Sequence, residues 1–174
     1  TRERDQVVAE RTVAKNQLHA ELAEAEPGKS SVDRIKKKVA FFDKQEKEIM
    51  TELKVVMSAD DEIKRQVALI CTIPGVGLLT AIIVLAETNG FELIRNKRQL
   101  VSYAGMDVRE KQSGTSVRGK PRISKKGNRY LRKAMHFPAL SAISHDEKYK
   151  AIFARLVSKH GIKMKAAVCV QRKM

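Results

Sequence analysis

The most constraining feature of this sequence is a long run in which apolar residues recur at alternating spacings of three and four. Ten of the twelve seam positions between residues 32 and 70 are apolar, and Glu46 and Asp60 are the two exceptions. This is the a/d pattern of a coiled coil, and its stripe must be covered by another helix. A two-helix hairpin or a coiled-coil dimer would satisfy it, and an ordinary amphipathic core helix is the third alternative. The seam comprises Val32, Ile35, Val39, Phe42, Glu46, Ile49, Leu53, Val56, Asp60, Ile63, Val67 and Ile70.

The segments on either side of this run set its limits. Residues 2–25 have a helical apolar face, and Pro27 with Gly28 predicts a turn before the seam begins. Ser58, followed by two aspartates at 60 and 61, has the composition of a fresh helix start, which predicts a break near residue 58. We therefore expect a coiled-coil or hairpin segment over 1–57 and a second domain over 58–174.

The second domain begins with a helix over 60–72 and the turn Pro74-Gly75-Val76-Gly77, from which an apolar helix runs from Leu78 to about Glu87. A hydrophobic-Pro-Gly-hydrophobic-Gly turn matches the helix-hairpin-helix element that binds nucleic-acid backbones. Its glycines permit a left-handed turn and expose amide groups to a phosphate oxygen. The alternative is a packing corner between two helices.

The remaining patterns predict further helices. Asn96 is expected to cap a short helix that ends at Gly105, and a helix from Asn128 to about Ser144 should kink at Pro138. A helix that stops at Gly161 and a last helix over 162–173 follow. Residues 106–126 have no helical or alternating apolar period and are expected to form a basic irregular loop or short irregular strands. The predicted fold class is all-α.

The formal net charge of +15 is confined to one part of the chain. Residues 1–60 hold 12 Lys/Arg and 12 Asp/Glu, whereas residues 61–174 hold 23 Lys/Arg and 8 Asp/Glu. An excess of one sign over this length favours a polyanionic partner, because basic groups placed on phosphates release counterions. A membrane surface would instead call for an amphipathic helix with lysines opposite bulky apolar residues. The basic residues here concentrate in a Gly/Ser-rich segment.

That segment, residues 111–133, holds nine Lys or Arg and no Asp or Glu, together with Ser113, Ser116 and Ser124. Arginine suits phosphate because its planar fork can donate two hydrogen bonds to one phosphate. A nucleophilic serine also needs a base, and residues 109–126 contain a single carboxylate, Glu110. These residues alone favour phosphate anchoring over catalysis, and a solvated loop is the third alternative.

Other functions find little support in the composition. The histidines lack close ligand spacing, so no metal site is expected from this chain alone. Cys71 and Cys169 are expected to be buried free thiols in a reducing compartment. Residues 1–26 lack the order of a signal peptide and no apolar run is long enough to span a membrane, so a cytoplasmic, nucleoid-associated protein without membrane contact is predicted.

Four ordered segments carry a family resemblance: "IPGVGLLTA", "NKRQLVSYAGM", "QSGTSVRGKPRISKKGNRYLRKAM" and "GIKMKAAVCVQRKM". They resemble the C-terminal transposase domain of the IS110 (Piv invertase-like) insertion-sequence recombinases. The opening "RERDQVVAERTVAKNQLHAEL" is similar to the helical segment that precedes this domain. The string from Ser113-Gly114 through "ISKKGNRYLR" is the specific part, whereas the Pro-Gly-Val-Gly turn alone is not.

The resemblance implies the serine-bearing, DNA-binding half of a site-specific recombinase that is guided by a bridge RNA. The serine of the Ser-Gly pair, which becomes joined to DNA in this family, is Ser113, and Ser116 is the runner-up. A RuvC-like acidic domain that binds Mg²⁺ is expected in the family and is absent from this sequence, so no cofactor is expected in this part. A homodimer through residues 1–57 and little cutting of DNA by this chain alone are also expected.

Combining the turn, the basic segment and the resemblance gives a set of candidate nucleic-acid contacts. These are Gly75, Gly77, Arg109, Lys111, Arg118, Lys120, Arg122, Lys125, Lys126, Asn128, Arg129 and Arg132. Two alternatives come from other functional classes. One is a non-catalytic helix-hairpin-helix module that binds branched or bent DNA, and the other is a helical scaffold with incidental charge.

Overall fold

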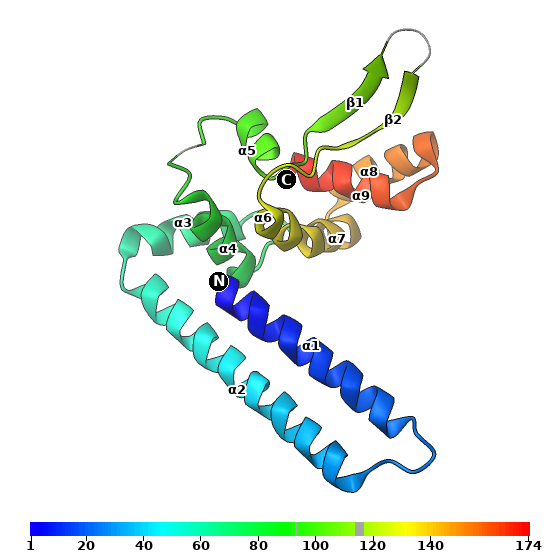
Figure 1. Cartoon of the computed structure of the whole chain (residues 1–174). Helices are drawn as coiled ribbons and strands as arrows, with labels where there is room; N and C mark the ends of the chain where they lie inside the picture. The colour runs from blue at the N-terminus through cyan, green and yellow to red at the C-terminus, as the bar shows by residue number, and fades with distance from the viewer. Residues whose placement is uncertain (93, 114–116) are drawn as a thin grey trace. The chain divides into compact units, whose positions relative to one another are not determined.

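A computed structural model of the chain describes residues 1–92, 94–113 and 117–174. Helices make up most of these residues, and the strands among them form one two-stranded ribbon (Figure 1). The all-α prediction is therefore confirmed. The chain divides into two compact units, Thr1–Lys64 and Arg65–Met174.

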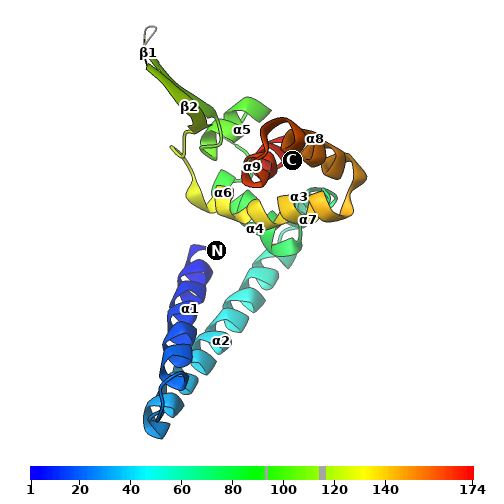
Figure 2. The same ribbon diagram turned by 90° about the vertical axis from the view of Figure 1, so that its right-hand side faces the viewer.

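The first unit is an antiparallel helical hairpin, which is one of the two arrangements that the coiled-coil seam predicts. Helix α1 (Arg2–Leu22) and helix α2 (Lys29–Ser58) lie side by side in both views (Figures 1 and 2). The turn between them occupies residues 23–28, so α1 ends slightly earlier than the expected helix over 2–25.

Small and aromatic side chains form the core of the hairpin. Val7 and Ala14 of α1 are buried with Phe42 of α2, and Val39 and Ile49 pack against them. Because the fully buried Ala14 is small, the two helices can approach closely at that level. Part of the seam of α2 is thus covered within the same chain, whereas Val56 near the end of α2 is 63% exposed.

An ion-pair network explains why Glu46 interrupts the apolar seam. The carboxylate of Glu46 accepts a hydrogen bond from Arg4 Nη2 at 2.5 Å and another from Arg11 Nη1. Arg11 Nη1 also donates to Asp43 Oδ1 at 2.8 Å, and this hydrogen bond is the main cause of the raised pKa of Arg11. Arginines of α1 therefore satisfy the polar seam position of α2, which fixes the register of the hairpin.

Helix α3 (Asp61–Cys71) begins at the predicted break after Ser58. Asp60 Oδ1 accepts hydrogen bonds from the amides of Glu62 and Ile63 at 2.8 and 3.1 Å. Asp60, the second polar seam position, is thus the N-cap of a new helix rather than part of a continuous coil.

The second unit holds the remaining elements. After α3 come α4 (Leu78–Thr88), α5 (Lys97–Tyr103), β1 (Val108–Ser113), β2 (Val117–Ile123), α6 (Arg129–Ala134), α7 (His136–His145), α8 (Glu147–His160) and α9 (Lys163–Lys173). Asn96 caps α5 as predicted, with its side chain accepting from the amide of Gln99 at 2.9 Å. Gly161 ends α8 in the left-handed region at φ +69°, also as predicted.

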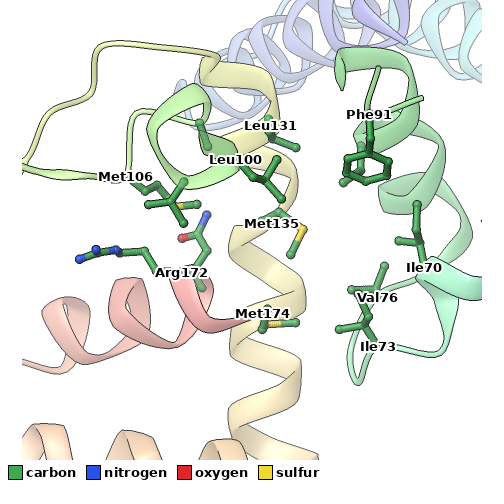
Figure 3. Close-up of a pocket in the computed structure, with 14 residues that line it drawn as sticks. Ile70, Ile73, Val76, Phe91, Leu100, Met106, Leu131, Met135, Arg172 and Met174 are labelled. Atoms are coloured by element: carbon green, nitrogen blue, oxygen red, sulfur yellow. The ribbon is translucent and has the colours of Figure 1, made fainter. Parts of the chain in front are cut away.

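The core of this unit surrounds an apolar cavity of about 120 Å³. Val84, Ala104, Met106 and Leu131 are buried beside it, and they come from α4, the end of α5 and α6. Figure 3 shows other side chains of the lining, including Phe91, Leu100, Met135 and Met174, pointing toward the same space. Apolar contacts around this cavity therefore hold together α5 and α6, the helices before and after the ribbon in the chain.

The predicted interruption by Pro138 is present, but it lies one turn earlier. Helix α6 ends at Ala134, Met135 forms a turn, and α7 begins at His136. A proline has no amide hydrogen and its ring clashes with the carbonyl four residues before it, which here belongs to Ala134. Pro138 therefore occupies the first turn of α7, where its missing donor costs nothing.

The segment expected to form a basic irregular loop or short irregular strands forms an antiparallel ribbon. Strand β1 pairs with β2, with Val108 opposite Ile123 and Ser113 opposite Val117, and a bulge lies between Arg109 and Lys111. The sequence lacks apolar alternation because the ribbon projects away from the helices of its unit, as both views show. Backbone hydrogen bonds at its root, which is formed by residues 103–107 and 124–128, determine its position.

Two glycines at positive φ, one at this root and one at the end of α8, allow a test of the close backbone approach at the root. Gly127 (φ +145°) would place a Cβ 2.8 Å from the backbone nitrogen of Gly105, whereas Gly161 (φ +69°) has open space around it. We expect Gly161→Ala to cost about 1 kcal/mol of unfolding free energy from backbone strain alone. Gly127→Ala should cost about 3 kcal/mol, since the backbone must also move apart.

Urea unfolding followed by tyrosine fluorescence measures this difference, because all three tyrosines (Tyr103, Tyr130 and Tyr149) lie in the second unit. Equal losses in the two variants would contradict a close backbone approach at Gly127.

Candidate nucleic-acid interface

The ribbon places two arginines of the candidate set directly opposite each other. Arg109 of β1 pairs in register with Arg122 of β2, and both side chains are exposed. Like charges at such a cross-strand pair repel each other. Neither guanidinium has an ion-pair partner in the part of the chain that the structure describes. A phosphate placed between them would relieve the repulsion.

The other strand residues of the candidate set follow the same ribbon. Lys111 lies opposite Gly119, Arg118 lies opposite Gln112, and Lys120 is in β2. Ser113 is the last residue of β1 and pairs with Val117. Ser116, the runner-up for the nucleophile, lies outside the described residues. The ribbon therefore brings Ser113 onto the same two strands as five candidate cations.

A short turn after β2 carries Lys125 and Lys126, which are both exposed. Lys125 has φ +54°, an uncommon conformation for a residue with a side chain. Hydrogen bonds hold it there: the amide of Lys125 donates to the carbonyl of Gly105 at 2.9 Å, and Lys126 N donates to Ser124 Oγ at 3.3 Å. The two lysines are thus presented from a fixed backbone.

Ser124, the third hydroxyl of the basic segment, contributes to this turn. Its Oγ donates to Asp107 Oδ1 at 2.5 Å, and its amide donates to the carbonyl of Asp107 at 2.8 Å. Asp107 lies just before β1, so this pair closes the base of the ribbon. The structure therefore gives Ser124 a structural role.

Asn128 and Arg132 support the fold from the other side of the turn. Asn128 caps α6 by accepting from the amides of Tyr130 and Leu131 at 2.9 and 3.0 Å. Arg132 Nη1 donates to the carbonyl of Ala104 at 2.6 Å, which satisfies the C-terminal end of α5. Their predicted contacts with nucleic acid stay predictions, and their observed contacts are within the protein.

Arg129, in contrast, lies on the surface. Its guanidinium stacks 4.9 Å from the centre of the Tyr130 ring, and its Nη2 donates to the Tyr130 hydroxyl at 3.1 Å. This holds one exposed cation at the start of α6, three residues after Lys126.

Sequence reasoning missed a buried carboxylate behind the ribbon. Glu87 of α4 is only 7% exposed, and it accepts a hydrogen bond at 2.6 Å from Asn128 Nδ2. Tyr103 adds a bond from its hydroxyl to the carbonyl of Glu87 at 2.8 Å, and Asn128 N donates to the carbonyl of Tyr103 at 2.7 Å. The sequence signal for this buried carboxylate is a single acidic residue in the otherwise apolar stretch "LLTAIIVLAET".

The Pro-Gly turn before α4 has a packing role. Gly75 has φ +82°, and a Cβ there would lie 2.9 Å from the backbone nitrogen of Ala142 in α7. Gly77 precedes α4 and has open space around it. The packing-corner alternative therefore accounts for Gly75, while phosphate binding at Gly77 and the start of α4 stays a prediction.

The described residues do not fit a metal centre. No group of three or more His, Cys, Asp or Glu within the described ranges lies close enough to hold an ion. Two or more carboxylates are the usual ligands of a catalytic Mg²⁺, and the ribbon itself carries only Glu110. The same residues contain no helix that is both long and apolar enough to cross a membrane.

One family model and several curated proteins are similar to this chain. The family model described as "Transposase IS116/IS110/IS902 family" matches residues 67–154. A pilin gene-inverting protein of Moraxella bovis is 26% identical over 120 residues, which are 68% of this chain and 37% of that protein. A transposase for insertion sequence element IS1111A of Coxiella burnetii is 34% identical over 96 residues, covering 54% of this chain and 24% of that protein.

An insertion element IS110 protein of 43.6 kDa from Streptomyces coelicolor is 32% identical over 84 residues, or 48% of this chain and 20% of that protein. The chain thus spans less than two fifths of the length of these relatives.

Proposed function

Because the chain belongs to the IS116/IS110/IS902 transposase family, we propose that it is the nucleic-acid-binding, serine-bearing part of a DNA transposase. The observation that carries this proposal is the ribbon, on which Arg109 and Arg122 lie opposite each other on the strands that also carry Ser113. The like charges of Arg109 and Arg122 make this cross-strand pair unfavourable unless an anion binds beside it.

The proposed reaction is a displacement at a phosphodiester of DNA. Ser113 Oγ forms a bond to phosphorus, one P–O bond of the DNA backbone breaks, and the leaving oxygen takes up a proton from solvent to become a hydroxyl group. The proton of the serine passes to a base. Arg109 and Arg122 would stabilise the negative charge that grows on the non-bridging oxygens.

The base is proposed to come from another domain. Glu110 is the single carboxylate of the ribbon, and the buried Glu87 is already hydrogen-bonded to Asn128. The family resemblance implies a RuvC-like acidic domain, which would supply carboxylates next to the ribbon. Strand cleavage is therefore expected only when this chain is joined to such a domain.

The serine is tested in that joined protein. We expect Ser113→Ala to abolish a covalent protein–DNA adduct, detected as a shifted band on a denaturing gel, and Ser116→Ala to leave it. Ser124→Ala is the control for loss of a hydroxyl, and since Ser124 bonds Asp107 it should mainly reduce stability.

An adduct that persists in Ser113→Ala would contradict the assignment, and loss of the adduct in Ser116→Ala alone would transfer the role to Ser116. If the wild-type joined protein binds DNA and never forms an adduct, the non-catalytic binding module is the better description.

Binding of duplex DNA by this chain tests the phosphate contacts. Each phosphate that is neutralised adds about 0.9 to the slope of log K against log salt concentration. Replacing both ribbon arginines (Arg109→Gln with Arg122→Gln) should lower that slope by about 2 in filter binding. The matched control replaces two exposed cations of α8, Arg155→Gln with Lys159→Gln, and should leave the slope nearly unchanged.

An equal fall of the slope in both double variants would indicate diffuse attraction by net charge rather than a site on the ribbon. Binding too weak to measure near 0.1 M salt would favour the helical scaffold.

Two partners are proposed with this function: a second copy of the chain and a guide RNA. Support for the dimer comes from large apolar residues that the hairpin leaves exposed, including Phe41 (57%) and Val56 (63%). Support for the RNA comes from the family resemblance and the excess of positive charge.

Size-exclusion chromatography with light scattering and absorbance detection addresses both partners. We expect twice the mass of the chain, a monomer for Phe41→Gln with Val56→Gln, and co-eluting RNA that ribonuclease removes. A monomeric wild type would contradict the dimer, and an absorbance spectrum free of nucleic acid would contradict stable RNA binding.

A further inference from the structure

A groove of about 730 Å³ lies between the ribbon and α9 of the second unit. Figure 1 shows α9 beside the base of the ribbon, and the groove is lined by residues of both elements and by the residues just before α9. Its size is in the range of clefts that hold small organic molecules or single nucleotides. The strand pairing of the ribbon and the contacts of α9 with α7 and α8 do not fill this space.

Several residues that line the groove are apolar and exposed, and we call these apolar lining residues its floor. Val108 of β1 is 47% exposed, Ile162 is 56% exposed, and Met164 at the start of α9 is 61% exposed. Ile123, which pairs with Val108, and Val168 of α9 extend the same floor. Apolar side chains gathered in a concave surface indicate a binding site rather than scattered surface residues.

The charged residues that line the groove are mostly cationic, and we call them its rim. Arg122 and Lys125 come from the ribbon side, Lys165 and Arg172 come from α9, and Glu110 is the one acid among the described lining residues. Protein–protein interfaces are depleted of lysine and of charged residues at their cores, whereas nucleic-acid interfaces are strongly positive. The combination favours a nucleic acid over a protein helix as the occupant.

An apolar floor also distinguishes between forms of nucleic acid. A duplex stacks its bases inside and presents phosphates and groove edges, so it offers no apolar face to the floor. An unpaired strand offers the faces of its bases, and its phosphates can follow the cations of the rim. A 2′-hydroxyl buried against Ile162 and Met164 would lose its hydration without gaining a partner, which disfavours RNA.

We propose that this groove holds unpaired nucleotides of a DNA strand, with base faces on the floor formed by Val108, Ile162 and Met164 and phosphates on the rim. This inference rests on the proposed function and specifies which form of DNA the second unit holds beside the ribbon. It assigns α9 a role that the candidate contacts, all between residues 75 and 132, do not include.

The test is fluorescence anisotropy of the full 174-residue chain with three labelled probes of one sequence: a 12-nucleotide single-stranded DNA, the corresponding DNA duplex and the corresponding RNA. The groove variant is Ile162→Asn with Met164→Gln. Ile162 is the N-cap of α9, where asparagine is favoured, and glutamine is similar to methionine in length and helix propensity, so α9 should remain folded.

The matched control is Leu69→Gln with Phe137→Gln, which removes two apolar side chains of the same unit that are 61% and 77% exposed and lie outside the groove. For the groove variant we expect single-stranded DNA affinity to fall about tenfold, since apolar contact with bases is lost, and duplex affinity to stay within about twofold. The control variant should bind both probes as the wild type does.

Several outcomes would overturn the inference. They are unchanged single-stranded DNA affinity in the groove variant, a loss shared equally by the duplex, or a loss confined to the RNA. A variant that turns a dimer into a monomer with its DNA affinity intact would show that the groove contacts a second copy. Wild-type protein that binds none of the probes would instead contradict the proposed function, so the two failures are distinguishable.

Discussion

The second unit depends on the close approach of two backbone segments, residues 103–107 and 124–128. Three amide hydrogen bonds connect them, from Asn128 to Tyr103, from Lys125 to Gly105 and from Ser124 to Asp107. The approach is possible because Gly105 and Gly127 present no side chain where they meet. Both strands of the ribbon and the start of α6 leave from this point, so the contact determines where the cations and Ser113 project.

Hydrogen bonds of buried polar side chains also stabilise this contact. Glu87 of α4 and Asn128 at the start of α6 are 41 positions apart, and their hydrogen bond connects the apolar helix to the ribbon root. Gln171 of α9, only 4% exposed, adds a bond of 2.6 Å to the carbonyl of Arg132. A buried polar side chain that is fully hydrogen-bonded favours one arrangement over others, because any shift leaves it unsatisfied.

The elements predicted from the sequence are those determined by neighbours along the chain. Asn96 and Gly161 sit at helix ends for local reasons, and both caps are present. The helix start predicted near Ser58 is also present, with Asp60 as its N-cap. The ribbon could not be predicted in the same way, because its sequence has no apolar alternation that would indicate paired strands. The hydrogen bond between Asn128 and Glu87 also could not be predicted, because the two residues lie far apart along the chain. The capping of α6 by Asn128, in contrast, is a local interaction.

In the candidate site, too, local features can be predicted from the sequence and long-range contacts cannot. Charge composition shows that the cations gather in one segment of the sequence, and the register then shows which of them lie opposite each other, such as Arg109 and Arg122. Composition does not separate exposed cations from those that hold the fold, so Arg132 was grouped with Lys126 although its guanidinium satisfies Ala104. The domain boundary expected at residue 57 stays a prediction, and the two compact units meet at Lys64 and Arg65.

The contacts within the hairpin of α1 and α2 determine whether the first unit folds before or after any association of two chains. Its core and its Arg–Glu network join residues within one chain, across a turn of six residues. Contacts of this kind form quickly and at a rate independent of protein concentration. The first unit can therefore fold as it leaves the ribosome, and any association of two chains follows folding rather than enabling it.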